Sequence, residues 1–176
     1  MERIMNHNFR MSLAGLILGG SLTGVANGAD PVTINITGNV IAAPCVVDGT
    51  NSVNVDLGDV PAVDLATADS ASLWQAFRIS VKNCPAGTTK VTATFNGTPA
   101  PDAPAHRYIN TGTATGVSIA LARDINLNLA NGATWTVNVD GSRSATWPMR
   151  ARMVASKGNA IPGTVKAVVV VTLTYQ

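Results

Sequence analysis

The chain has 176 residues, of which 46% are hydrophobic and 12% are charged, and its formal net charge at pH 7 is +2. This length fits a single domain of ordinary size. A net charge this close to zero, without a basic run, argues against nucleic acid as a partner.

The first 28 residues have the layout of a secretory signal peptide. Arg3 and Arg10 give a basic end, residues 11–25 are apolar and uncharged, and the small residues Ala26 and Gly28 follow. The alternative is a membrane anchor, but an apolar run of about 15 residues is shorter than the roughly 20 needed to cross a bilayer. We therefore predict a signal peptide over residues 1–28, cleaved after Gly28 or one residue later, and export of the remainder.

The exported part begins with a strand-like segment, residues 29–41. Its polar residues alternate with a row of small and apolar ones, namely Val32, Ile34, Ile36, Gly38 and Val40. Burial of the four apolar side chains in this row would contribute about 1.5–3 kcal/mol each, or roughly 6–12 kcal/mol gross. Periodicity alone favours an ordinary first strand of the chain's own sheet.

Both cysteines, Cys45 and Cys84, lie in the exported part. An oxidising compartment favours a disulfide, which would close a loop of about 40 residues and contribute about 4 kcal/mol in the chain-entropy model. A metal or redox pair would need closer spacing or further ligands, and His106 is the single histidine after residue 28. We predict a structural disulfide and no metal site.

The middle of the chain has a period of two rather than 3.6. Apolar residues alternate with polar ones over residues 77–82, 91–96, 117–121, 135–139 and 147–153. Such alternation predicts strands with one buried and one exposed face. Turn clusters separate these segments every dozen or so residues, which is typical of an antiparallel sandwich. No long amphipathic helix is expected, although residues 65–75 could form a short helical turn or a loop.

The last segment, residues 165–176, is predicted to be a strand whose pairing partner is not evident from the sequence. Residues 167–171 are apolar on both faces, which is typical of a central strand. No later residues of this sequence could pair with it. Its partner is therefore expected from elsewhere in the fold or from another chain, because an open apolar edge would aggregate.

Residue types that carry catalysis are sparse. His106 lies in the proline-rich stretch 99–108 and is predicted to be a surface loop residue, which leaves no base for a serine triad. Asp56, Asp59 and Asp64 could be imagined as carboxylates for sugar hydrolysis, but turn and hydrogen-bond roles are the better interpretation for Asp56 and Asp59. There is no phosphate-binding loop. We predict no enzyme activity and no cofactor.

The three tryptophans could suggest a sugar-binding platform. Trp135 and Trp147 share the register of their apolar neighbours, however, and we predict that these two pack in the core.

Four motifs occur in order along the exported part. They are the N-terminal alternation that ends in Ala43-Pro44-Cys45, the stretch Val55-Asp56-Leu57-Gly58-Asp59, the stretch Val81-Lys82-Asn83-Cys84-Pro85-Ala86-Gly87, and an end with Gly163 at the fourteenth position from the C-terminus and Tyr175 at the penultimate one. Together, behind a signal peptide, they resemble chaperone–usher pilins, and among these the minor tip-fibrillum subunits of type 1-like pili.

The resemblance implies an all-β fold, an incomplete immunoglobulin-like sandwich over residues 42–176 that lacks its final (G) strand and is completed by a donor strand from another chain. It also reverses the interpretation of residues 29–41. Val32, Ile34, Ile36, Gly38 and Val40 become a donor strand for a neighbouring subunit, with Gly38 where the receiving groove is shallow. Pro31 departs from the family pattern and, lacking an N–H, should weaken pairing there.

The resemblance further implies an acceptor groove that a periplasmic chaperone fills first and that a donor strand enters at an outer-membrane usher. The residues assigned to this groove are Gly163, Val169, Val171, Leu173, Tyr175 and Gln176. The carboxylate of Gln176 would be anchored by basic residues of the chaperone.

The function implied is a structural pilus subunit, a minor tip adaptor that serves cell adhesion on the bacterial surface. Neighbouring pilus subunits are its partners, because a head-to-tail contact that does not close makes a filament. Two alternatives remain: the major rod subunit, and a complete secreted sandwich domain that binds sugar.

Overall fold

The structure is a computed structural model that describes residues 31–124 and 127–176. The predicted signal peptide therefore lies outside the described residues. Two units are distinguished, Met1–Gly38 and Asn39–Gln176, and each is described by itself. Residues 31–38 contain no helix or strand, and their side chains are exposed.

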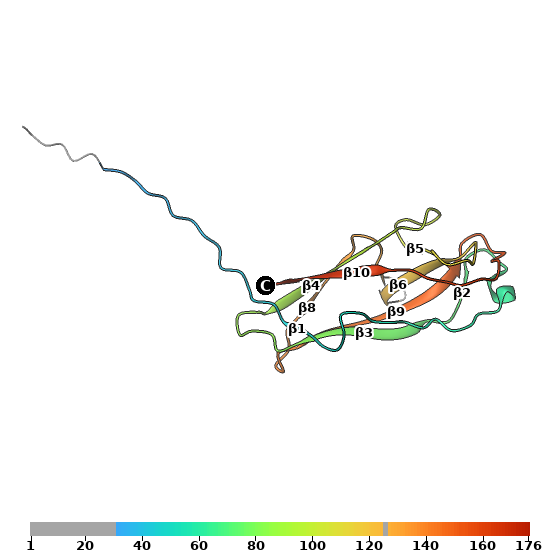
Figure 1. Cartoon of the computed structure of the whole chain (residues 1–176), viewed down its shortest axis with the longest axis horizontal. Helices are drawn as coiled ribbons and strands as arrows, with labels where there is room; N and C mark the ends of the chain where they lie inside the picture. Colours follow the sequence, from blue (N-terminus) through green and yellow to red (C-terminus); the bar gives the residue numbers. More distant parts are fainter. Residues whose placement is uncertain (1–30, 125–126) are drawn as a thin grey trace, which may run out of the picture. The chain divides into compact units, whose positions relative to one another are not determined.

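The second unit consists of two antiparallel sheets (Figure 1). The larger sheet has the order β1-β3-β9-β6-β5, with β2 also paired to β9 and β7 to β6. Its strands are β1 (Val46–Val47), β2 (Ser70–Ala71), β3 (Gln75–Lys82), β5 (Tyr108–Ile109), β6 (Ser118–Asp124), β7 (Leu127–Asn128) and β9 (Ala145–Ala155). The smaller sheet has the order β10-β4-β8, formed by β4 (Lys90–Gly97), β8 (Thr134–Asn138) and β10 (Val169–Tyr175).

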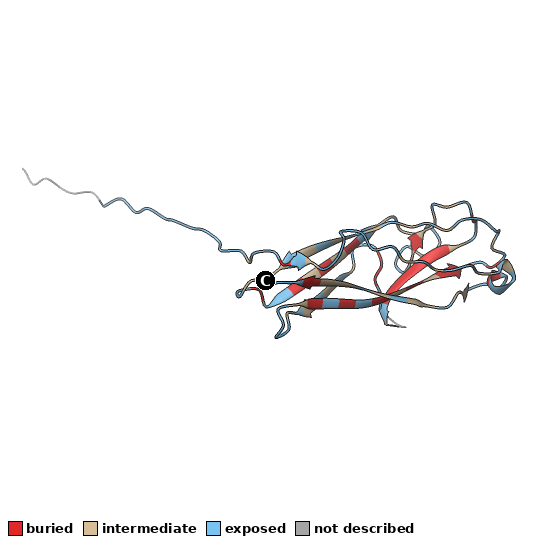
Figure 2. Ribbon diagram, turned by 60° about the horizontal axis from the view of Figure 1, so that its bottom comes forward, coloured by how far each residue is buried: buried red, intermediate tan, exposed pale blue. Residues whose placement is uncertain are grey.

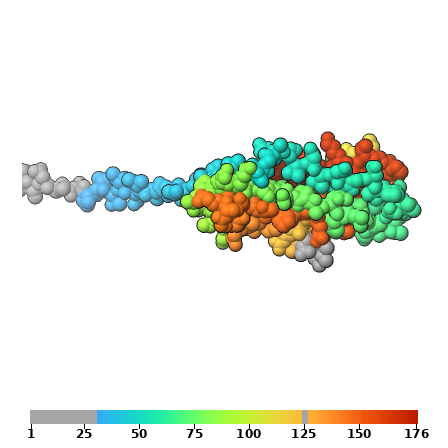
Figure 3. All heavy atoms as spheres, turned by 90° about the horizontal axis from the view of Figure 1, so that it is seen from below, coloured from blue at the N-terminus to red at the C-terminus, as the bar shows by residue number. Residues whose placement is uncertain are grey.

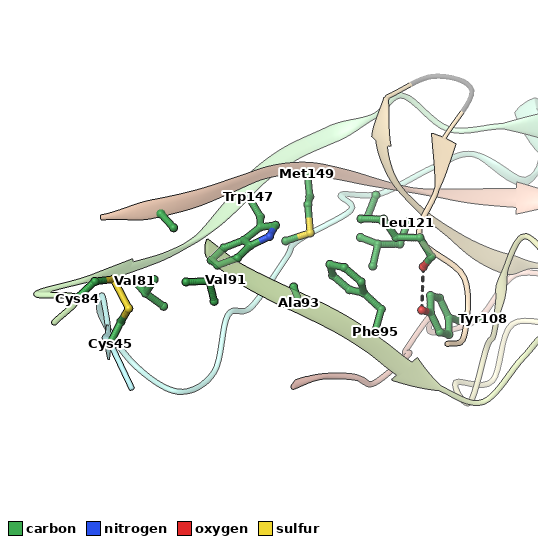
Figure 4. Close-up of a cluster of buried hydrophobic side chains, with 13 residues drawn as sticks. Cys45, Val81, Cys84, Val91, Ala93, Phe95, Tyr108, Leu121, Trp147 and Met149 are labelled. Atoms are coloured by element: carbon green, nitrogen blue, oxygen red, sulfur yellow. Dashed lines mark hydrogen bonds between the residues drawn. A yellow bond between two sulfur atoms is a disulfide. The ribbon is translucent and has the colours of Figure 1, made fainter. Parts of the chain in front are cut away.

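The hydrophobic core lies between the sheets (Figure 4). Trp147 from the larger sheet and Phe95 from the smaller one are both fully buried, which confirms the predicted core position of Trp147. The indole N–H of Trp147 donates to the carbonyl of Trp135, which is half-buried against the same core. Figure 2 shows that the buried residues are gathered within the sandwich and its connections.

The disulfide Cys45–Cys84 is confirmed and joins the residue just before β1 to the turn just after β3. The predicted alternating strands are confirmed as β3, β4, β6, β8 and β9. The predicted helical turn begins earlier than expected, as the 3-10 helix η1 (Ala62–Leu65), and β2 follows it. Within the described residues, no helix is long and apolar enough to cross a membrane.

Residues 31–45 form no strand, although their alternation favours a first strand in the chain's own sheet. A strand needs a neighbour for its backbone N–H and C=O groups. Among the described residues no strand pairs with this segment, so the interpretation from periodicity alone is wrong.

Candidate functional site: a groove beside the last strand

The last strand, β10, lies at the edge of the smaller sheet. It pairs with β4 over its whole length, from Val169 opposite Gly97 to Tyr175 opposite Val91. No described strand pairs with its other edge. The apolar character of both faces predicts a central strand, and the structure places it at an edge with one side open.

Burial along β10 shows the same asymmetry. The inward residues Val169, Val171, Leu173 and Tyr175 are only half-buried, while Val170 on the outer face is 61% exposed. On the neighbouring strand β4, the inward residues Val91, Ala93 and Phe95 are at most 1% exposed. Because the two strands share one sheet and one core, the difference indicates that β10 lacks a neighbour on its open side.

A groove with a volume of about 1430 Å³ runs along this open side. Residues 160–173 form one wall and residues 47–62 the other. The floor consists of core-facing side chains of the larger sheet, including Phe77, Ile79, Ile119, Leu121, Met149, Ala151 and Met153. In Figure 3 the segment after β1, in cyan to teal, and the red C-terminal segment meet along the upper edge of the domain. An apolar floor of core residues is what a sandwich exposes when one strand is missing.

Of the residues predicted for the groove, Gly163, Val169, Val171 and Leu173 line it. Tyr175 points inward and packs against the core beyond it, and Gln176 is exposed. The main-chain oxygen of Gln176 accepts hydrogen bonds from the N–H groups of Thr89 and Lys90, so the end of β10 is held against the start of β4. The roles of these residues toward a partner stay predictions.

Close packing of the backbone explains why residue 163 is a glycine. A Cβ there would lie 2.4 Å from the backbone nitrogen of Ala114, and one on Gly112 would lie 2.1 Å from the carbonyl oxygen of Thr164. Two backbone segments thus approach too closely for side chains. Asn110 Oδ1 also accepts a hydrogen bond from the N–H of Lys166 at 2.8 Å. The close backbone approach and this hydrogen bond together fix the segment that leads into β10.

Tyr108 closes the core next to the groove. Its hydroxyl donates to the carbonyl of Leu129 at 2.8 Å, and burial raises the pKa of the phenol to about 12. A Cβ on Gly97 would lie 2.8 Å from the Tyr108 ring, so the glycine allows the tyrosine to pack under β4.

The predicted donor residues Val32, Ile34, Ile36 and Val40 are exposed, and nothing lies within 4 Å of a Cβ built on Gly38. The main chain that follows them is anchored: Thr88 Oγ1 donates to the carbonyl of Ala43 at 3.2 Å. Thr88 is the neighbour of Thr89, which binds Gln176. The chain preceding Cys45 therefore enters the domain beside the C-terminal end of β10.

Of the residues considered for catalysis, Asp56 has a structural role. Asp56 Oδ1 accepts from the N–H of Gly58 at 2.9 Å, which is the turn role predicted for it. His106 is exposed. No group of three or more His, Cys, Asp or Glu residues that could hold a metal ion occurs in the described part of the chain.

The second wall of the groove is the part that the sequence analysis missed. Val53, Val55 and Leu57 alternate with polar residues, which is a period-two signal, and the last two pack against the core. This alternation could have indicated an extended segment lining the sandwich. It forms no strand, because no strand in the described part of the chain pairs with it.

Residues 34–176 match the family described as "Fimbrial protein". The chain is 43% identical to protein FimG of Escherichia coli K12 over 148 residues, which are 84% of this chain and 86% of the relative. It is 39% identical over 170 residues to the S-fimbrial adhesin protein SfaS of Escherichia coli strain 536, covering 94% and 99% of the two chains. The crystal structure of the P pilus rod subunit PapA shares the fold, with a TM-score of 0.63 at 22% identity over 76% of this chain and 100% of that one.

Proposed function

The chain belongs to the fimbrial protein family, and we propose that it is a minor adaptor near the pilus tip that polymerises by donor-strand complementation and exchange. As a fimbrial protein it is an exported structural subunit of surface fimbriae and not an enzyme. Its fold is an immunoglobulin-like sandwich without the final strand, as predicted. The observation that carries the proposal is the open side of β10, where half-buried residues border a groove floored by the core.

A strand from a neighbouring subunit would complete this sandwich. Its main chain would pair with the free N–H and C=O groups of β10, and its alternate side chains would cover the floor formed by Phe77, Leu121 and Met149. Main-chain pairing gives affinity, and the fit of alternate side chains sets the register.

Residues 29–41 suit the donor role toward the next subunit. Five alternating side chains from Val32 to Val40 require nine residues, or about 30 Å of strand. Burial of the four apolar ones supplies roughly 6–12 kcal/mol gross. Residues 31–41 form no strand, and the main chain after them is held at Ala43, which leaves these residues available to another chain.

The resemblance to chaperone–usher pilins implies a chaperone and an usher, and the open edge of β10 supports the need for the chaperone. An open strand edge above an apolar floor is an aggregation hazard, so a subunit in the periplasm needs a carrier that covers it. We propose that a periplasmic chaperone holds the groove and the carboxylate of Gln176, and that the outer-membrane usher is where a donor strand replaces it. Repetition of this open, head-to-tail contact builds a filament.

Peptide capture tests this proposal. Residues 42–176, oxidised, would be mixed with a peptide of residues 29–41 and with a control peptide in which Ile34 and Ile36 are aspartate. We expect one donor peptide per domain, a raised melting temperature and no capture of the control. A folded, oxidised domain that captures neither peptide would contradict the proposal.

The adaptor position is supported by the likeness to minor tip subunits, and copy number tests it. Quantitative mass spectrometry of purified fimbriae should find a few copies per filament. Thousands of copies would identify the chain as the rod subunit.

A further inference from the structure

The connection between the donor residues and the folded domain is short. Val40 is the last residue of the alternating row, and Thr88 Oγ1 donates to the carbonyl of Ala43 at 3.2 Å. Because an extended chain spans at most about 3.3–3.6 Å per residue, the three steps from Val40 to Ala43 cover roughly 10 Å. A subunit whose Val40 sits in the groove of another subunit therefore has its own domain directly beside that groove.

The direction of the donor strand decides at which end of the groove this domain lies. Every strand pair in the two described sheets is antiparallel. A strand that completes the smaller sheet beside β10 continues this arrangement. Val40, at the C-terminal end of the donor row, then lies next to the segment that precedes Val169. We call this end of the acceptor the distal end.

The distal end carries exposed apolar side chains. Figure 1 shows η1, the teal coil, at the end of the domain opposite the C-terminus. Val63 in η1 is 77% exposed, and Ile161 is 60% exposed. Both belong to an apolar rim that consists of Pro61, Ala62, Val63, Ile161 and Pro162. All of these except Val63 line the groove, so the rim is continuous with it.

Backbone contacts hold η1 against the segment that leads into β10. The carbonyl of Leu65 accepts from the N–H of Ala160 at 3.3 Å, and that of Ala66 accepts from the N–H of Asn159 at 3.0 Å. A Cβ on Gly158 would lie 2.4 Å from the carbonyl oxygen of Ala66, so the two backbones touch. The rim is ordered without a partner, which lowers the entropic cost of association.

The rim contributes little to the domain's own core. Leu65 of η1 is buried, whereas Val63 on the same short helix is largely in solvent. Apolar side chains gathered on one exposed surface are typical of an interaction site. The short connection after Val40 brings a second domain to this same end.

The surface that meets the rim is set by the same connection. Thr88 holds Ala43, and the disulfide joins Cys45 to Cys84, so residues 84–88 accompany the donor strand. This loop contains no charged residue, and its Ala86 and Gly87 are exposed. It can pack on an apolar surface without removing an ionic group from water.

We propose that the apolar rim is a second contact between consecutive fimbrial subunits, packed against residues 84–88 of the subunit that donates the strand. This contact rests on the proposed donor-strand function and adds to it. The donor strand joins the two subunits, and the rim fixes their relative orientation.

Two ligands separate the rim from the groove. The acceptor is the oxidised mature chain, residues 29–176, in which Ile34→Asp and Ile36→Asp prevent it from donating. The first ligand is the peptide of residues 29–41. The second is a mature chain whose own groove is filled by a further copy of residues 29–41, joined after Gln176 by a flexible linker. Because the second ligand brings its domain to the rim, it should bind about tenfold or more tightly than the peptide.

The acceptor variant Val63→Asn locates the contact. It should weaken binding of the second ligand about tenfold, as expected when one valine side chain is no longer buried. The Kd of the peptide should stay within about twofold, because Val63 does not line the groove. Leu127→Asn is the matched control, since Leu127 is also exposed, at 44%, but lies on β7 outside the rim. It should leave the Kd of both ligands within about twofold.

Methyl NMR of the acceptor without a substitution in the rim gives a second readout. The Val63 methyl signals should shift when the second ligand binds and should stay in place with the peptide. If the acceptor does not capture the peptide, the donor-strand function fails and this contact fails with it. The rim contact alone is overturned if the peptide is captured but the Val63 signals do not respond to the second ligand. It is also overturned if Val63→Asn changes the affinities of the two ligands equally or changes neither.

Discussion

Replacement of Leu173 with alanine distinguishes a half-filled groove from a completed core. Leu173 points inward from β10 and is half-buried in the domain without a donor. The substitution removes three carbon groups, worth about 2.4 kcal/mol when fully buried at about 0.8 kcal/mol each. About half of that, roughly 1.2 kcal/mol, should appear as lost stability of the free domain.

The other half should appear when a donor strand covers the side chain. The affinity for the donor peptide should then fall by about 1.2 kcal/mol, which is roughly eightfold in Kd. Calorimetric titration of residues 42–176 with the peptide of residues 29–41 measures this, and urea unfolding measures the stability of the free domain.

Val170→Ala is the control on the same strand. Val170 lies on the outer face and is 61% exposed, so its truncation should leave the peptide affinity within about twofold. Equal peptide affinities for the unaltered domain and Leu173→Ala would refute the reasoning. So would a loss as large for Val170→Ala.

The remaining predictions concern the donor strand, a buried phenol and the disulfide. A donor peptide with Gly38→Val should bind about 1–3 kcal/mol more weakly by overpacking the groove, whereas Thr37→Val, on the other face, should bind normally in the same titration. Tyr108→Phe should lower the free energy of unfolding in urea by about 1–2 kcal/mol, because a buried carbonyl loses its donor. Burial raises the pKa of Tyr108 to about 12 from an ordinary value of 10, so the stability that its phenol contributes is complete below pH 10 and is lost as the pH rises through 12. The difference in unfolding free energy between the unaltered protein and Tyr108→Phe should therefore shrink over that range. A constant difference would contradict the assigned burial. The double substitution Cys45→Ser and Cys84→Ser should lower the free energy of unfolding by about 4 kcal/mol, measured by thermal or urea unfolding.

Local alternation identified the faces of the strands because burial repeats every second residue. Phe77, Val91 and Trp147 all lie in alternating segments, and each faces the core. Export likewise made the Cys45–Cys84 bond predictable from the compartment alone.

Alternation does not reveal which strand lies next to which. Residues 167–171 are apolar on both faces, yet Val168 and Val170 are exposed because no described residues cover the outer face of β10. Val55 and Leu57 alternate with polar residues as in a strand, but no described strand pairs with this segment. The stacking of Arg150 and Arg152 on Trp74 was not predicted, for a related reason. It depends on the pairing of β3 with β9, which brings Trp74 to Arg152 across a long stretch of sequence.

The central claim is that the open edge of β10 is completed by a strand from another polypeptide. The most direct measurement is the set of intermolecular nuclear Overhauser effects between isotope-labelled residues 42–176 and an unlabelled donor peptide. We predict a continuous ladder of contacts from the peptide backbone to residues 169–175. A bound or unbound domain in which that edge is paired by the chain's own residues, with no contacts to the peptide, would contradict the account.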